Sequence, residues 1–474
     1  MIVVKFGGTS LAGTDRMRAA ARIVAAHRRD EEVVCVVSAM AGVTDALLSL
    51  ARTTRAGSTS RAQSLTALRA RHETMLPGLA TPATVAETTH TLATMWRQLE
   101  RDLEALDGMR IDVTPHHAHA VAAFSGWGER LSAVLFASAL RCEGMAASAN
   151  TREPVILATE DAHAVLGPAV HEAQSLSALR HAVERSVALT RESLMTAATH
   201  IATTGETLVL PGYLARTSGG MVTTVGRNGS DLSAAIIAAA LGARDLYIYS
   251  DVHGVHQADP RAVPKARLLP ALTYADAAEI ASLGARVLHP AALVPLSLAQ
   301  IPLHLRSSFD PYARGTDIGS SWFVRGTLRL SSEGRRDWVV VARPVPADAT
   351  LPDVNASHPP DLVEIQGVML THESSFTDAS LNANSEQEPD GIPAMGAGNH
   401  SGPVAAALAL LRRSPSPVGL ALSPRRVTVI VPASEAVATQ RRLYAALSRA
   451  NIPSVAARRH ERARPAGQIW RQVP

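Results

Sequence analysis

The sequence predicts an α/β protein whose strands form a mainly parallel sheet. Two apolar runs, Ile2–Val4 and Val33–Val37, have the length and β-branched composition of strands buried on both faces. Between them, apolar side chains recur at helical spacing, at Met17, Ala20, Ala21 and Val24. A strand, a helix and a second strand in this order require parallel pairing. Glycine-bearing polar loops follow both strands, at the edge where open parallel sheets bind ligands.

The same alternation continues along the chain and predicts one α/β domain over residues 1–320. Thr14 is predicted to cap the first helix, and a helical region follows over Arg52–Arg110. Further strands are predicted at Pro154–Leu157, Thr207–Leu210, Met221–Val225, Asp245–Tyr249 and Pro302–Leu305. Further helices are predicted at Leu232–Leu241, which Gly242 ends, and at Tyr274–Leu283.

Composition narrows the class of protein. The chain has 474 residues, which predicts more than one domain, and its 46% apolar and 19% charged residues are typical of globular proteins. No apolar run is long enough to cross a bilayer, and the chain begins with a strand rather than a signal peptide. The formal charge of +4 is spread along the chain, so we expect neither nucleic-acid nor membrane binding. Two cysteines provide no disulfide framework, and a cytoplasmic location is the expectation.

Two glycine-rich loops carry the chemistry. In Lys5–Ser10, a strand ends in two glycines, so backbone N–H groups and the lysine charge could attract a phosphate. Taken alone, an ordinary strand-to-helix turn explains this loop equally well. The second loop, Gly226–Asp231, precedes a helix and carries an arginine suited to a carboxylate or phosphate. Its aspartate could cap the helix, pair with a lysine or face a metal ion. Two such loops in one chain favour a functional site.

Three other patterns are disfavoured as sites. The histidine-rich stretch Pro115–His119 has no cysteine or nearby carboxylate to complete a metal site. Gly8 and Gly13 have the spacing of a Walker A motif, but Thr14 stands where that motif requires lysine. Gly396–Gly398 has no preceding strand and therefore lacks the context of a dinucleotide site.

Together, the motifs of residues 1–320 resemble those of the aspartate kinases, within the amino-acid kinase family. Seven segments carry the resemblance, in the family's order: Lys5–Ser10 (KFGGTS), Ser38–Thr44 (SAMAGVT), Gly128-Glu129, Thr223–Asp231 (TTVGRNGSD), Ser250–Gly254 (SDVHG), Asp259–Arg261 (DPR) and Gly284–Pro290 (GARVLHP). The resemblance implies a three-layer sandwich around an eight-stranded, mainly parallel sheet. It also implies transfer of the γ-phosphate of ATP, with Mg²⁺, to the β-carboxylate of L-aspartate. The product, 4-phospho-L-aspartate, begins the pathway to lysine, threonine and methionine, and no covalent enzyme intermediate is expected.

The resemblance further implies roles for single residues. Lys5 and Asp231 would be catalytic: Lys5 would stabilise charge on the phosphoryl group, and Asp231 would orient lysines or lie on the magnesium side. Aspartate would be held by Ser38, Thr44, Glu129, Arg227 and Ser230. Within that set, Glu129 would meet its α-amino group and Arg227 its carboxylate. The nucleotide would be bound by Lys5, Gly7, Gly8, Ser10, Ser250, Asp251, His256, Arg261, Arg286 and Val287. No residue is assigned as a direct metal ligand.

The chemistry agrees with these roles. The substrate carboxylate is ionised at neutral pH, so the reaction requires no general base, only positioning and charge neutralisation. Three positions depart from the family: His256 replaces a tyrosine, Arg286 a lysine and Ser250 a threonine. The first predicts altered packing on the adenine side, and the second keeps the charge but changes its geometry. None removes a catalytic group, so we expect an active enzyme.

Residues 321–474 lack the family's motifs. Aspartate kinases usually end in two ACT domains, which bind a feedback amino acid, so the resemblance implies an α+β, diverged ACT-like region, an amino-acid effector and a homodimer. Strands are expected at Trp338–Ala342, Leu362–Leu370, Arg426–Val431 and Pro453–Ala457, and helices at Pro403–Arg412 and Thr439–Arg449. The proline-rich segment 344–360 and the polar segment 377–402 are expected to be flexible.

Two other functions compete with an aspartate kinase. One is a kinase that phosphorylates a different carboxylate, such as that of glutamate, although Glu129, Arg227 and the Leu288–Pro290 segment argue against it. The other is a regulatory protein that binds aspartate or ATP without turnover. Product formation from L-aspartate and ATP separates them.

Overall fold

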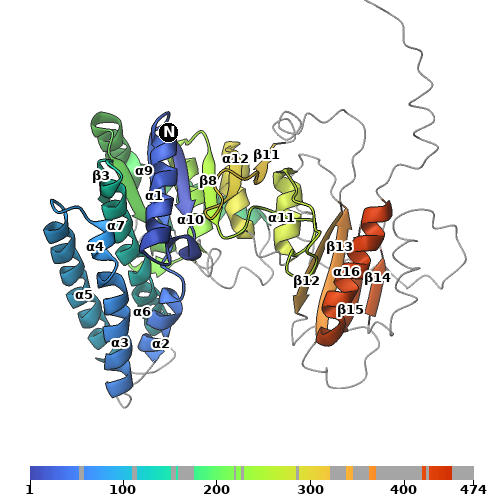
Figure 1. Ribbon diagram of the computed structural model, residues 1–474, viewed down its shortest axis with the longest axis horizontal. Helices are drawn as coiled ribbons and strands as arrows, with labels where there is room; N and C mark the ends of the chain where they lie inside the picture. The colour runs from blue at the N-terminus through green and yellow to red at the C-terminus, as the bar shows by residue number, and fades with distance from the viewer. Residues whose placement is uncertain are drawn as a thin grey trace, which may run out of the picture.

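A central eight-stranded sheet organises the computed structural model (Figure 1). The structure describes residues 1–52, 58–108, 115–150, 156–158, 176–217, 220–225, 229–283, 288–320, 338–344, 362–369, 419–422 and 426–450. In spatial order the strands are β3 (Ala147–Ala149), β5 (Thr207–Pro211), β2 (Val33–Val37), β1 (Ile2–Phe6), β8 (Leu246–Ser250), β10 (Leu303–Ser307), β11 (Thr316–Gly319) and β9 (Ala271–Thr273). Neighbours pair in parallel except β10 and β11. The predicted eight-stranded, mainly parallel sheet is confirmed.

Strand β1 lies inside this sheet, and its side chains alternate between the two faces of the sheet. Lys5 stands opposite Val36 of β2 and Ile248 of β8. Alternate residues of β1 face opposite sides: Val3 belongs to one hydrophobic cluster, and Ile2, Val4 and Phe6 to the other. All four of these side chains are fully buried, as expected of a strand covered on both faces.

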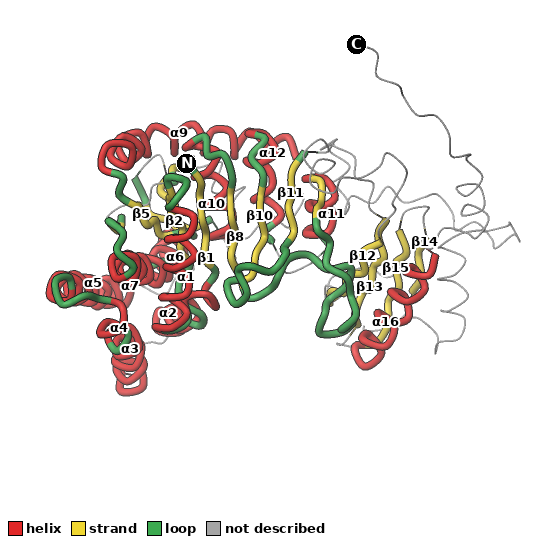
Figure 2. Tube along the Cα trace, turned by 45° about the horizontal axis from the view of Figure 1, so that its top comes forward, coloured by secondary structure: helices red, strands yellow, loops and turns green. Residues whose placement is uncertain are grey.

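Helices cover both faces, which makes the three-layer sandwich that the sequence predicted (Figure 2). One layer contains α1 (Thr14–Arg28), α2 (Val43–Arg52), α3 (Ser58–Glu73), α4 (Leu76–Leu79), α5 (Val85–Gly108), α6 (Pro115–Ser125) and α7 (Trp127–Cys142). The other contains α9 (Leu176–Thr204), α10 (Gly229–Leu241), α11 (Tyr274–Ser282) and α12 (Leu293–Ala299). Across the described ranges, none of the helices combines the length and apolarity needed to span a membrane.

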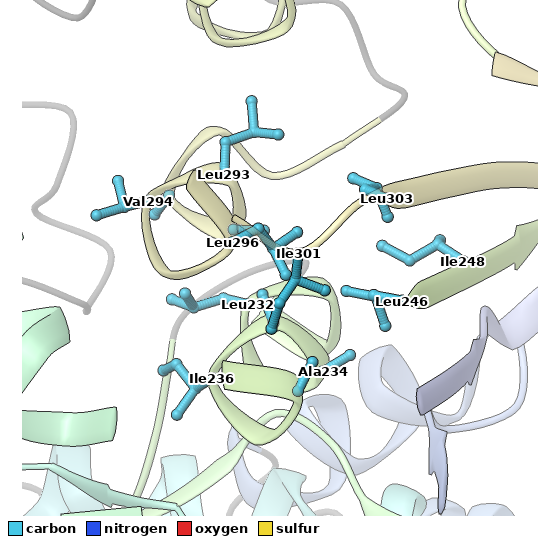
Figure 3. Close-up of a cluster of buried hydrophobic side chains, with 14 of the residues drawn as sticks. Leu232, Ala234, Ile236, Leu246, Ile248, Leu293, Val294, Leu296, Ile301 and Leu303 are labelled. Atoms are coloured by element: carbon cyan, nitrogen blue, oxygen red, sulfur yellow. The ribbon is translucent and has the colours of Figure 1, made fainter. Parts of the chain in front are cut away.

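Helix α10 is the most enclosed element of the second layer. Its residues from Gly229 to Ala240 are all buried, and its side chains in the hydrophobic core include Leu232, Ala234 and Ile236 (Figure 3). Figure 3 shows this cluster between α12 on one side and strands β8 and β10 on the other. A helix that is apolar on all sides is stable only when it is covered on all sides. This packing fixes the position of the helix's first turn, which carries Ser230 and Asp231.

Several local predictions needed correction. Gly13, not Thr14, is the N-cap of α1, and no side chain caps it. Helix α10 starts at Gly229, three residues before the predicted Leu232. The predicted strand Pro154–Leu157 lies partly outside the described residues. What is described is a two-residue strand, β4 (Leu157–Ala158), in a separate three-stranded sheet with β6 (Leu214–Thr217) and β7 (Val222–Thr224).

The described C-terminal residues form an antiparallel sheet covered by one helix. The strand order is β12 (Trp338–Pro344), β13 (Leu362–Met369), β15 (Arg426–Pro432) and β14 (Gly419–Leu422), with α16 at Ala433–Ala450. The sequence predicted three of these strands, missed β14 and began the helix six residues late. The predicted helix Pro403–Arg412, strand Pro453–Ala457 and segment 377–402 lie outside the described residues, as does segment 344–360 apart from its first residue.

The C-terminal sheet contacts the segment that connects β8 to β9. The Val340 N–H donates to the carbonyl of Gln257 at 2.7 Å, and Val340 also forms a parallel bridge with Ala258. Arg441 of α16 donates through Nε to the carbonyl of Ala262 at 2.5 Å. Ala258 and Ala262 share a hydrophobic cluster with side chains of the sheet and of α16. The β8–β9 segment therefore lengthens one edge of the C-terminal sheet.

Candidate active site

Loops from four strands meet at the carboxyl edge of the large sheet. The Gly7 N–H donates to the carbonyl of Tyr249 at 3.0 Å, which joins β1 to β8. The Ala41 N–H donates to the carbonyl of Gly8 at 3.0 Å, which joins the loops after β1 and β2. The Gly212 N–H donates to the carbonyl of Val37 at 2.9 Å, which joins β5 to β2. The predicted gathering of glycine-bearing loops at this edge is therefore observed.

Lys5 and Asp231 form a buried ion pair at the centre of this edge. The Lys5 Nζ donates to an Asp231 carboxylate oxygen at 2.5 Å. Both residues are over nine-tenths buried, and an unpaired charge would be costly there. Asp231 also lies in the first turn of α10, where the helix dipole favours a negative charge. An ammonium group has three donors, so this bond leaves two with which Lys5 can contact a phosphoryl group.

Two glycines allow backbone segments to approach closely at the site. A Cβ on Gly8 would lie 2.5 Å from the carbonyl oxygen of Ala39 and 3.1 Å from the nitrogen of Ala41. A Cβ on Gly212 would lie 2.8 Å from the Cβ of Ser230. Any other residue would push these loops apart. Because Gly7 already donates its N–H within the sheet edge, the predicted phosphate cradle rests on Gly8 and the residues after it.

Glu129 is a buried carboxyl group with unused acceptor capacity. It lies in the first turn of α7 and is 4% exposed. Burial raises the pKa of Glu129 to about 7, although backbone N–H donors and the charge of Lys5 act in the opposite direction. Its Oε2 atom is buried and has no hydrogen-bond partner among the described residues. A buried acceptor of this kind can receive a cation such as an ammonium group.

Three predicted substrate-binding hydroxyls lie on segments at the same edge as this carboxyl group. Helix α7 begins directly against the loop after β2, because a Cβ on Gly128 would lie 2.7 Å from the Ala39 Cβ. That loop carries Ser38 and runs into the first turn of α2, which carries Thr44; both residues are half-buried. Ser230 is buried beside Gly212. The structure therefore places the segments that carry these residues next to those that carry Glu129 and Asp231.

Four of the predicted nucleotide-binding residues lie at the end of β8 and in the segment after it. Ser250 ends β8, and Asp251 follows it in an exposed position. His256 is half-buried, and burial lowers its pKa. Arg261 is exposed and pairs with Asp259, with 2.9 Å between Nη2 and a carboxylate oxygen. Arg261 also lies close enough to Asp251, another predicted nucleotide-binding residue, to interact with its charge, and its contact with a nucleotide remains a prediction.

Other predicted positions lie outside the described residues. Arg227 belongs to the undescribed segment 226–228, and Arg286 and Val287 belong to 284–287. The side chains of Pro115–His119 are likewise not described. Within the described part of the chain, no group of three or more His, Cys, Asp or Glu side chains could hold a metal ion.

Sequence reasoning missed two residues at this edge. Tyr213 has a φ of 65°, in the left-handed region that a tyrosine rarely adopts, and its N–H donates to Ser233 Oγ at 2.8 Å. Ser308 follows β10, and its hydroxyl lies 2.7 Å from that of Ser10. Ser308 could have been found, because the strand predicted at Pro302–Leu305 runs into serines at the same edge. Nothing in the sequence indicated the backbone conformation of Tyr213.

Comparison with known proteins places this geometry in context. A model of the Amino acid kinase family matches residues 1–307. The chain is 31% identical over 321 residues to lysine-sensitive aspartokinase 3 of Escherichia coli, a match covering 67% of this chain and 63% of that protein. It is 32% identical over 336 residues to an aspartokinase of Chlamydia trachomatis, covering 70% and 66%. With a bifunctional aspartokinase/homoserine dehydrogenase of Zea mays, the match covers 67% of this chain and 32% of the relative. The chain thus spans under two thirds of these relatives' length.

Solved structures extend the likeness to nearly the whole chain. Escherichia coli aspartokinase III in complex with aspartate and ADP superposes with a TM-score of 0.66 at 21% identity, covering 94% of this chain and 100% of that one. The same protein with lysine and aspartate gives a TM-score of 0.65, also at 21% identity. Clostridium acetobutylicum aspartate kinase gives 0.57 at 15% identity, covering 94% of this chain and 99% of that one. At these identities the likeness establishes a shared fold.

Proposed function

Because the chain belongs to the amino acid kinase family, we propose that it transfers the γ-phosphate of ATP to the β-carboxylate of L-aspartate, giving 4-phospho-L-aspartate. The observation that carries this proposal is the buried Lys5–Asp231 pair beside the buried, partly unsatisfied carboxyl group of Glu129. The Lys5–Asp231 pair suits a phosphoryl group, and the Glu129 carboxyl group suits the ammonium group of an amino acid. The relatives named aspartokinase and a structural neighbour solved with aspartate and ADP support the same assignment.

In this mechanism the protein positions the reactants and neutralises charge. The aspartate carboxylate is already ionised and attacks the γ-phosphorus directly, so no residue needs to remove a proton. Lys5, held by Asp231, balances the charge that develops on the transferring group. Gly8 packs tightly against the loop after β2. This contact keeps the loop after β1, proposed to bind the phosphates, at a fixed distance from the loop after β2, proposed to bind aspartate.

Substrate selection in the proposal rests on Glu129. Its carboxylate would accept a hydrogen bond from the α-amino group of aspartate, and the hydroxyls of Ser38, Thr44 and Ser230 would contact the rest of the substrate. Arg227 would bind a substrate carboxylate. The described residues leave Glu129 Oε2 without a partner, and the ammonium group of an amino acid would satisfy it.

Mg²⁺ is proposed to accompany ATP. Magnesium is usually held by one or two carboxylates together with substrate phosphates and water. Asp231 is the carboxylate at the phosphoryl end of the site and lies in the first turn of α10, so the residues present suit a metal that the nucleotide brings. The ion would neutralise phosphate charge alongside Lys5.

Regulation, assembly and location complete the proposal. The Escherichia coli relative is named lysine-sensitive, and one solved structure of aspartokinase III contains lysine, so we propose an amino-acid effector for the C-terminal region. Pairing of that region between two copies would give a homodimer. A cytoplasmic location is proposed because the substrates are soluble metabolites.

The test is an activity assay on the full chain with ATP and Mg²⁺. Hydroxylamine traps an acyl phosphate as a hydroxamate, and a coupled assay measures ADP release. We expect both signals with L-aspartate and neither with L-glutamate. Signal with glutamate alone would favour the other carboxylate kinase. Binding of aspartate and ATP without either signal would favour a regulatory protein that lacks turnover.

A further inference from the structure

An arginine of α1 contacts the ring of a phenylalanine in the loop after β10. Arg16 lies in the first turn of α1, and its guanidinium carbon stands over the Phe309 ring, 3.7 Å from the ring centroid. Phe309 follows Ser308, whose hydroxyl lies 2.7 Å from that of Ser10 in the loop after β1. The contact therefore places a positive charge beside the loop that is proposed to bind the phosphates of ATP.

Both partners of this contact lie at the carboxyl edge of the large sheet. Helix α1 connects two neighbouring parallel strands, β1 and β2, so it starts at the edge where β1 ends. Phe309 comes shortly after the end of β10, which runs parallel to β8. The Ser308 N–H donates to the carbonyl of Ser250, the last residue of β8, at 2.8 Å, and this bond holds the loop against the end of β8. Arg16 thus stands at the same edge of the sheet as the Lys5 ammonium group.

The guanidinium of Arg16 has unused hydrogen-bonding capacity. It carries five N–H donors, and among the described residues no hydrogen bond or ion pair engages them. Arg16 is exposed, so a ligand can reach it from solvent. Lys5, by contrast, is buried and already pairs with Asp231. A planar guanidinium can bind two oxygens of one phosphate at once, which suits it to supplement the charge of that lysine.

We propose that Arg16 is a further nucleotide-binding residue, which Phe309 holds in position for a phosphate group of ATP. This inference rests on the proposed function, in which the loop after β1 binds the phosphates. A long side chain loses rotamer freedom when a ligand fixes it, and this loss weakens binding. Because the ring already restrains the guanidinium, the charge-assisted hydrogen bond to the phosphate forms at a smaller entropic cost. Arg16 provides the bond, and Phe309 provides the restraint.

The test is a double-mutant cycle on the full chain with Arg16→Ala and Phe309→Leu. Calorimetric titration with Mg²⁺ and the non-hydrolysable ATP analogue AMP-PNP gives a Kd that does not depend on turnover, and steady-state assays give both KM values. Arg16→Ala should raise this Kd and the ATP KM about five- to tenfold, between the effects of an exposed ion pair and of a charged hydrogen bond, and leave the aspartate KM unchanged. Phe309→Leu should raise the Kd about two- to fivefold, because Arg16 loses its restraint, and should change nothing once Arg16 is replaced.

Arg22→Ala is the matched control. Arg22 is an exposed arginine of the same helix that faces Glu143, so its removal takes the same charge from α1 without touching the ring contact. It should leave the AMP-PNP Kd near the wild-type value. Phe309→Tyr keeps an aromatic ring and should also retain wild-type affinity. Thermal unfolding of each variant separates loss of folding from loss of nucleotide binding.

Three results would overturn the proposal. The first is an unchanged AMP-PNP Kd in Arg16→Ala, and the second is an equal rise in Arg22→Ala, which would show a general effect of charge. The third is an effect of Phe309→Leu that is absent, or that is equal with and without Arg16. A wild-type chain that binds AMP-PNP but phosphorylates no amino acid would refute the proposed function instead, and the titrations would still decide the role of Arg16.

Discussion

At the scale of single residues, the site depends on burying a charge and giving it one partner. Lys5 lies on the central strand of a sheet covered on both faces, and Asp231 lies on a helix that is buried on all sides. Neither side chain has freedom to move away from the other. A lysine held in this way presents its charge without reorganising when the reaction begins, which is the condition for effective electrostatic catalysis.

Lys5→Ala is therefore expected to lower kcat at least about a hundredfold. The variant also leaves Asp231 buried without its partner, which costs about 3–5 kcal/mol of unfolding free energy. Urea denaturation and the hydroxamate assay measure the two effects separately. Lys5→Arg keeps the charge but not the geometry and should recover stability more than activity. A Lys5→Ala protein with wild-type turnover would contradict the catalytic role.

Glu129 predicts how aspartate binding depends on pH. With a pKa of about 7 in the free protein, its carboxyl group gains a proton as the pH falls below neutrality. Only the ionised form accepts a charge-assisted bond from an ammonium group, so the aspartate KM should rise about tenfold per pH unit below 7. Steady-state assays between pH 6 and 8.5 measure this, with the ATP KM as internal control. In Glu129→Gln the aspartate KM should be high and independent of pH.

The same carboxyl group predicts the sign of a stability effect. Its pKa is higher in the folded protein than in the unfolded chain, so between about pH 4.5 and 7 the folded state binds more protons. Its contribution therefore makes the folded protein less stable as the pH rises through that window. Glu129→Gln should remove this part of the pH dependence of stability.

A pH-independent aspartate KM in the wild type would argue against Glu129 as the amino-group ligand.

At the scale of elements, Gly8 sets the distance between the loops after β1 and β2. Gly8→Ala would place a methyl group 2.5 Å from the backbone carbonyl of Ala39, which cannot rotate away. We expect the loops after β1 and β2 to separate, with kcat falling at least tenfold and both KM values rising. Gly13→Ala is the matched control, because nothing lies within 4 Å of its added Cβ and its φ of −176° suits any residue. Equal kinetics for the two variants would contradict this reading.

Elements also show what the sequence could and could not predict. Val33–Val37 was predicted to its exact bounds, because a continuous β-branched run has few other uses. The start of α10 was placed three residues late, because Gly229-Ser230-Asp231 resembles a loop and becomes helical only through packing against Gly212 and Val225. Strand β14 was missed, since Gly419–Leu422 is short and is defined by pairing with β15. The local sequence pattern is enough to predict a strand such as Val33–Val37, whereas tertiary contacts determine where α10 starts and whether β14 forms.

The residues of the candidate site divide in the same way, into those that the sequence indicated and those that only the fold brings together. Lys5 and Asp231 stand out in the sequence as charged side chains in glycine-rich loops, whereas Glu129 was predicted only through the family resemblance. Ser10 was predicted to bind the nucleotide, but its partner Ser308 lies 298 residues away, and only the sheet order β1-β8-β10 brings them together. Tyr213 carries no sequence signal, because its left-handed backbone is imposed by its bonds to Ser233 and Val225.

At the scale of the whole molecule, the C-terminal sheet supports a segment of the proposed nucleotide site. The β8–β9 connection carries His256 and Arg261, and its middle part lies beside β12 (Figure 2), pairs with it and contacts side chains of α16. Tyr444 of α16 donates its hydroxyl to Gln257 Oε1 at 3.3 Å. If the segment binds the nucleotide as proposed, bonds of this kind would couple nucleotide affinity to the position of the C-terminal region, because the segment can move only if they break.

Arg441→Ala is expected to raise the ATP KM about two- to fivefold, because it removes the bond to the Ala262 carbonyl that holds this segment. The aspartate KM should not change, since Glu129 and the loop after β2 lie on other elements. Val437→Ala is the control, because Val437 is an exposed side chain of the same helix. Arg441→Lys retains a donor and should recover part of the affinity. If Arg441→Ala and Val437→Ala behave alike, or if the aspartate KM rises instead, the C-terminal region does not support the nucleotide segment through this contact.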